Sequence, residues 1–107
     1  DGVKGQEKQA SKTISLIKVQ KPIELSTIKF TERGCSDLVI RLYNPWRRET
    51  KIIIEFKDLE AIEICEAKLN EEVIECKPFS KRVELEFKPG EIKTIILREA
   101  KLKFTLI

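Results

Sequence analysis

Val83-Glu84-Leu85-Glu86-Phe87 is the stretch that decides the fold of this 107-residue chain. Its apolar residues fall at every second position, and consecutive side chains of a β-strand point to opposite faces. The three apolar side chains therefore face a core, and the two glutamates face water. We interpret Glu84 and Glu86 as a solvated strand face and not as a glycosidase pair, because 18 acidic residues at alternating positions create such pairs by chance.

Other segments repeat or modify this pattern. Residues 38–42 and 102–106 alternate in the same way, whereas Ile52-Ile53-Ile54 is apolar on both faces and is predicted to be central or covered. Two sheets packed face to face account for both patterns. The apolar phase slips by one within residues 14–19 and again between Leu25 and Ile28, which predicts a β-bulge or a strand that changes sheets.

Turn residues separate these segments at intervals of about 8 to 12 residues, as in a β-sandwich. Pro89-Gly90 has the residue order of a type II turn. The fold class is therefore all-β: an antiparallel β-sandwich, immunoglobulin-like or related, with about 7 to 9 strands. The predicted strands cover residues 12–19, 22–31, 37–43, 50–57, 60–68, 73–77, 82–88, 91–98 and 101–106.

The chain is predicted to be one domain with a polar leader. Residues 1–11 are polar and lack periodicity, so we expect a flexible leader or linker, followed by a single domain over residues 12–107. Because the chain starts at Asp1 and contains no methionine, we expect it to be part of a longer product. No apolar run approaches the length of about 20 residues that crosses a bilayer, so no membrane contact is expected.

The composition argues against several function classes. The chain has no histidine, which excludes Ser-His triads and His-based zinc sites within it. Its four glycines are isolated and form no phosphate-binding loop. The net charge of +3 comes from interleaved Lys and Glu, so no nucleic-acid partner is expected.

The charge and cysteine content predict a source and a compartment. Charged residues make up 36% of the chain, a proportion typical of thermophilic proteins. Three cysteines form neither a closed disulfide framework nor a CxxC metal pattern, which favours a reducing compartment. We expect a cytoplasmic protein of a thermophilic prokaryote.

Aromatic and cationic residues cluster once, at the predicted turn Tyr43-Asn44-Pro45-Trp46-Arg47-Arg48. Such a cluster can stack on a sugar ring or hold an anion. We favour the other interpretation, a hairpin corner in which Asn44-Pro45 sets the turn and Trp46 covers one end of the sandwich, because a single Trp without a second aromatic platform is a weak signal for a binding site. Tyr43, Trp46, Arg47 and Arg48 are therefore candidates for a carbohydrate or interdomain contact, with Trp46 at least partly exposed.

Two of the three cysteines are predicted to face each other. If Asn70-Glu71 is the tip of a tight hairpin, antiparallel pairing places Cys65 opposite Cys76. A cross-strand disulfide is then geometrically allowed, and intracellular disulfides occur in hyperthermophiles. The same two residues would also pack well as free thiols.

Four stretches together resemble the C-terminal β domain of family 38 glycoside hydrolases, the α-mannosidases. Residues 37–44 resemble the strand of that family that ends in Arg-Leu-Tyr/Trp-Asn, and residues 66–72 are similar to its Glu-x-x-Leu-x-Glu corner. Residues 88–94 resemble its Pro-x-Glu-Ile-Lys-Thr closing hairpin, and residues 24–29 its preceding strand. The resemblance spans roughly residues 22–98. The chain departs from the family by having Gly90 and by continuing through residues 99–107.

The resemblance implies a parent enzyme that hydrolyses terminal α-mannosides with retention, using zinc and an aspartate nucleophile in an N-terminal domain. This chain would then be non-catalytic, hold no cofactor, cleave no α-mannoside alone, and dock onto the other domains of its parent. Alternatives are a carbohydrate-binding module that presents Tyr43 and Trp46 to a glycan, and an interaction module that self-associates through a strand at residues 101–107.

Four further residues are expected to have structural roles: Arg41, Asn44, Pro89 and Glu91. Arg41 lies in an otherwise apolar strand, so its guanidinium needs a carboxylate or carbonyl partner if it is covered.

Overall fold

The computed structural model describes residues 17–30 and 37–102, and all regular structure in these ranges is β-strand. No helix in the described ranges is long and apolar enough to span a membrane. The strands are β1 (Ile17–Val19), β2 (Glu24–Phe30), β3 (Leu38–Tyr43), β4 (Thr50–Phe56), β5 (Leu59–Glu60), β6 (Glu63–Ala67), β7 (Val73–Pro78), β8 (Arg82–Phe87), β9 (Ile92–Arg98) and β10 (Lys101–Leu102).

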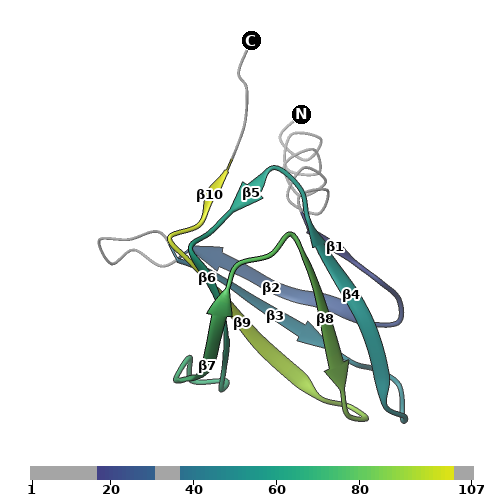
Figure 1. The fold of residues 1–107 in the computed structure, drawn as a ribbon. Coiled ribbons are helices and arrows are strands. Elements are labelled where there is room, and N and C mark those ends of the chain that lie inside the picture. The colour runs from purple at the N-terminus through teal and green to yellow at the C-terminus, as the bar shows by residue number, and fades with distance from the viewer. Residues whose placement is uncertain (1–16, 31–36, 103–107) are drawn as a thin grey trace, which may run out of the picture.

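These strands form a β-sandwich with antiparallel pairing throughout (Figure 1). One sheet has the order β1-β4-β8, and the other has the order β2-β3-β9-β6-β7. The short strands β5 and β10 pair separately at the end of the sandwich opposite the β8–β9 turn. The predicted all-β sandwich is confirmed.

The core lies between the inner faces of the two sheets. In β8, Val83 and Phe87 are buried and Leu85 is half-buried, while Glu84 and Glu86 are exposed, as the alternation predicted. β4 is the central strand of its sheet, which confirms the prediction for the Ile52–Ile54 run. Burial of each large side chain contributes about 1.5–3 kcal/mol. The main cluster comprises Ile17, Ile23, Leu38, Ile40, Leu42, Ile52, Ile54, Phe56, Leu59, Ile64, Val83, Phe87, Ile95, Leu97 and Ala100.

The predicted single strand over residues 60–68 was wrong. The chain forms β5, which pairs with β10, and then β6, which pairs with β7 and β9. A straight strand cannot serve both sets of partners, and the chain bends between them at Ala61 and Ile62. The Ile62 N–H then donates to the Arg98 carbonyl at 2.9 Å, which starts the β6–β9 pairing.

A register shift in the β2–β3 pair and the turn at Pro89-Gly90 were both predicted from the sequence. The β2–β3 register shifts between Leu25 and Thr27, so the predicted bulge is confirmed. In the Pro89-Gly90 turn, the Glu91 N–H donates to the Lys88 carbonyl at 3.0 Å, and Gly90 has a φ of 67°. This is the type II geometry, and it explains Gly90, because glycine adopts positive φ without a steric penalty.

Two further predictions extend beyond the described residues. Of the strand expected at residues 12–19, the structure describes Ile17–Val19, and residues 14–16 with their phase slip lie outside. Of the strand expected at residues 101–106, it describes Lys101–Leu102, which already pairs with β5. The alternation at residues 104 and 106 and the 1–11 leader lie outside the described ranges.

Candidate functional site

Asn44 organises the corner that follows β3. Its side chain is fully buried, and its Nδ2 donates to the carbonyls of Arg48 at 3.1 Å and Lys88 at 3.0 Å. Its Oδ1 accepts the Trp46 N–H at 3.1 Å, and its own N–H donates to the Glu91 carbonyl at 2.9 Å. One amide therefore ties the β3–β4 corner to the β8–β9 turn.

Trp46 lies in the connection between the end of β3 and the start of β4 and is 46% exposed, in line with the expected partial exposure. The Trp46 carbonyl accepts the Gly90 N–H at 3.2 Å, so the backbone beneath the ring is fixed by the neighbouring turn. The Arg48 guanidinium lies 4.8 Å from the centre of the indole ring, a cation–π contact. Arg47 and Arg48 are both exposed, so the corner presents one aromatic ring and two cations.

An apolar groove of about 550 Å³ adjoins Trp46. It lies where β1, at the edge of one sheet, meets β2, at the edge of the other, so it opens between the two layers. The groove was not predicted from the sequence, because all of its residues except Pro45 and Trp46 come from the segment of residues 17–25, which reads as core strands and a turn. The lining residues are Ile17, Val19, Lys21, Pro22, Ile23, Glu24, Leu25, Pro45 and Trp46.

Tyr43 does not line this groove, so the groove lacks the pair of rings that would favour the carbohydrate-binding alternative. The side chains of Leu38, Ile40 and Leu42 on β3 join the main core, and alternation turns Tyr43 to the opposite, outer face of the sheet. Trp46, in contrast, lies beyond the end of β3. The structure therefore separates the two aromatic candidates.

Arg41 finds the partners that its covered position requires. Its Nη2 donates to the Leu69 carbonyl at 3.0 Å and to Glu71 Oε2 at 3.1 Å, and Lys29 Nζ lies 2.8 Å from the same carboxylate oxygen. Arg41 and Glu71 come from two different stretches of the family resemblance. The pair therefore fastens the β6–β7 corner to the outer face of the five-stranded sheet.

Glu71 should make the domain sensitive to acid. The hydrogen bond from Lys29 lowers its pKa below 4.5, partly opposed by burial, with smaller lowering by Arg41. A lowered folded-state pKa means that the stabilisation is fully present above the unfolded value and is lost as pH falls through the folded value. We expect Glu71→Gln to cost about 1 kcal/mol at pH 7 and nothing at pH values below the folded pKa, measured by urea unfolding.

Glu72→Gln is the matched control for this prediction. Glu72 is exposed, and its carboxylate lies 3.9 Å from Lys68 Nζ in an exposed pair. Such pairs contribute a few tenths of a kcal/mol, so its removal should leave the pH dependence almost unchanged. Equal pH profiles for Glu71→Gln and Glu72→Gln would contradict the role given to Glu71.

The closing hairpin is held by Glu91. Its Oε1 accepts the Lys88 N–H at 2.7 Å across the turn, and its Oε2 lies 3.5 Å from Lys93 Nζ. Lys93 also pairs with Glu66 at 3.2 Å and lies over the Phe87 ring. The contacts of Glu91 therefore lie within the fold. Pro89 occupies the turn position that favours proline.

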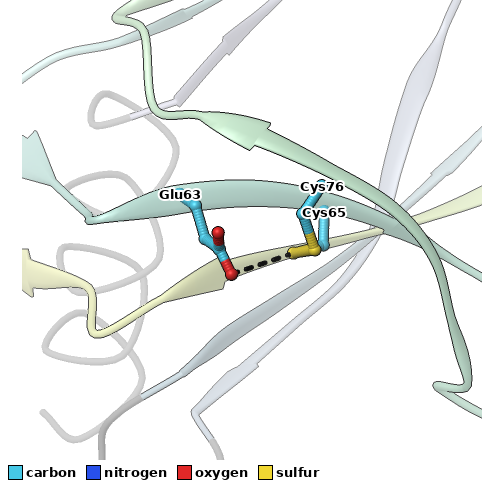
Figure 2. Close-up of side chains that lie close together, drawn as sticks. All are labelled: Glu63, Cys65 and Cys76. Carbon is cyan, nitrogen blue, oxygen red and sulfur yellow. Dashed lines mark hydrogen bonds between the residues drawn. A yellow bond between two sulfur atoms is a disulfide. The ribbon is translucent and has the colours of Figure 1, made fainter.

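Cys65 pairs directly with Cys76 between β6 and β7, which confirms the predicted register. The two residues form a disulfide, and Cys65 is fully buried (Figure 2). Cys35 lies outside the described residues. Glu63, two residues before Cys65 on the same face of β6, approaches the disulfide.

Comparison with known families decides the relationship of this chain. The model of the glycosyl hydrolases family 38 C-terminal beta sandwich domain matches residues 22–95, more than half of the chain. The chain belongs to this family. The match includes β2, β3, the Trp46 corner and the Pro89-Gly90 turn. No curated protein and no solved structure matches the chain.

Proposed function

We propose that this family 38 C-terminal domain is a non-catalytic docking domain of a zinc-dependent, retaining α-mannosidase. In this proposal the catalytic residues and the catalytic zinc belong to the remainder of the parent enzyme. The domain binds that remainder through the Trp46 corner and the adjoining groove. The family assignment supports a parent glycoside hydrolase, because the matched model describes a C-terminal domain of such enzymes.

The groove beside Trp46 is the observation that carries this proposal. Lys21 and Glu24 are the only charged residues among the nine that line it. A half-exposed tryptophan above an aliphatic groove is the kind of surface that anchors a protein interface. The occupant that fits this lining is an apolar segment of the preceding part of the parent chain.

A sugar platform at Trp46 is less well supported. Sugar sites combine a stacking ring with several convergent hydrogen-bonding groups. Here Arg48 stacks on the ring, and the neighbouring groove is mainly aliphatic. Tyr43, the second aromatic candidate, lies on the outer face of the sheet and lines no part of the groove.

The docking proposal is tested with the 107-residue domain and the preceding part of the parent produced as separate chains. Trp46→Ala should raise the dissociation constant about 30-fold, equivalent to about 2 kcal/mol, in titration calorimetry. The isolated variant should lose less than about 1 kcal/mol in urea unfolding, because Trp46 packs mainly at the surface.

Ile62→Ala provides the control, since Ile62 is 62% exposed and lies in the segment between β5 and β6, away from the corner. It should leave the dissociation constant unchanged. Equal losses for Trp46→Ala and Ile62→Ala would contradict docking at the corner. A saturable change in Trp46 fluorescence with free mannose would instead favour a carbohydrate site.

A further inference from the structure

Glu63, Cys65 and Cys76 converge on one face of the five-stranded sheet (Figure 2). Glu63 and Cys65 are two residues apart on β6, so they share a face, and Cys76 is the direct cross-strand partner of Cys65. One ligand atom from each lies within 4.8 Å of the other two. Paired strands hold all three backbones, so the cluster is preorganised.

The distance between sulfur and carboxylate oxygen is close to that of a tetrahedral zinc site. Zn–S bonds of about 2.3 Å and Zn–O bonds of about 2.0 Å place neighbouring ligands about 3.8 Å apart for S···S and about 3.5 Å for S···O. Cys65 Sγ already lies 3.8 Å from Glu63 Oε2. A disulfide sulfur carries no hydrogen, so this contact is not a hydrogen bond while the disulfide persists. After reduction, side-chain rotation can separate the sulfurs by the distance that the metal needs.

Arg98 supplies the charge balance and the outer-shell contact for such a site. Two thiolates and one carboxylate carry three negative charges, a divalent ion carries two positive charges, and Arg98 adds the third. Arg98 Nη1 lies 3.0 Å from Glu63 Oε2, and Arg98 is also opposite Glu63 in the β6–β9 register. Carboxylates that bind metals are commonly held by a second partner of this kind, which fixes their orientation.

We propose that the reduced domain binds a thiophilic divalent cation, Zn²⁺, through Cys65 Sγ, Cys76 Sγ and the Glu63 carboxylate, with water as the fourth ligand. Reduction by a dithiol or phosphine transfers two electrons to the disulfide and breaks the S–S bond, and two protons from the dithiol or from water complete the two thiols, while the dithiol becomes a disulfide or the phosphine a phosphine oxide. Binding of Zn²⁺ then releases the two thiol protons as the Zn–S bonds form. Because the sulfurs cannot be bonded to each other and bind zinc at once, oxidation and metal binding exclude each other.

The test uses the 107-residue chain carrying Cys35→Ser, so that the two remaining cysteines are those of the site. After reduction with a phosphine, Co²⁺ should produce a thiolate-to-cobalt charge-transfer band, and Zn²⁺ should abolish that band. Zn²⁺ should also raise the melting temperature of the reduced chain but not that of the oxidised chain. The oxidised chain provides the comparison without any further substitution.

Two carboxylate variants separate a metal site from simple thiol binding. Glu63→Gln should weaken Co²⁺ binding about 10-fold or more. Glu75→Gln should leave it unchanged, because Glu75 is paired with Glu66, and alternation places both on the face opposite Cys65. Cys76→Ser should abolish the charge-transfer band. Absence of the band in the reduced chain, or equal binding by Glu63→Gln and Glu75→Gln, would overturn the proposal.

Discussion

Asn44→Ala is expected to destabilise the isolated domain by about 3 kcal/mol. The Asn44 side chain is fully buried and makes three hydrogen bonds, to Arg48, Lys88 and Trp46. Each such bond contributes about 1 kcal/mol. Loss of the side chain removes the acceptor of the Trp46 N–H, whereas the Arg48 and Lys88 carbonyls keep the Thr50 hydroxyl and the Glu91 N–H as donors. Urea unfolding monitored by Trp46 fluorescence measures the loss, because Trp46 is the only tryptophan in the chain.

Asn44→Asp tests the mechanism of this loss. An ionised aspartate has nearly the same shape but only accepts hydrogen bonds, so it keeps the bond from the Trp46 N–H and loses the two donated bonds. It should therefore also destabilise the domain strongly. Thr50→Ala is the control, because the Thr50 hydroxyl donates to the same Arg48 carbonyl in an exposed setting. A cost for Thr50→Ala as large as that for Asn44→Ala would argue against Asn44 as the centre of the corner.

Loss of the Cys65–Cys76 disulfide is expected to have a similar effect. The bond closes a loop with a sequence separation of 11, and the chain-entropy model assigns about 3 kcal/mol to a loop of this size. The double replacement Cys65→Ala and Cys76→Ala should lower the free energy of unfolding by about this amount. β7 should be affected first, because β6 is its only partner strand in the described ranges.

Reduction of the unmodified domain, without added metal, serves as the comparison for the double variant. A phosphine should destabilise the unmodified domain and leave the double variant unaffected. Thiol counting on the denatured, non-reduced chain should find one free thiol. Three free thiols would contradict the disulfide and remove its contribution to stability.

The Trp46 corner and the β6–β7 corner owe their positions to β3. Asn44 follows β3 and binds the β8–β9 turn, whereas Arg41 within β3 binds Glu71 of the β6–β7 corner. The stretches that carry the family resemblance are therefore joined by direct hydrogen bonds in the folded domain. We expect replacements in these pairs to act mainly through stability.

The sequence by itself determined the fold class, most of the strands, the bulge near Leu25, the type II turn at Pro89-Gly90 and the register that pairs Cys65 with Cys76. These features depend on residue periodicity and local turn geometry, and both can be recognised from the residues of a single segment. The need of Arg41 for a partner was also predictable, because a covered guanidinium requires one.

Only the tertiary structure decided which distant segments meet. It broke the predicted 60–68 strand in two, because its halves pair with different strands. It placed Trp46 beside a groove lined by β1 and β2 but sent Tyr43 to the outer face, and it brought Glu63 and Arg98 to the cysteine pair. Strand order and sheet packing set these contacts, and both depend on long-range pairing that no local pattern of residues encodes.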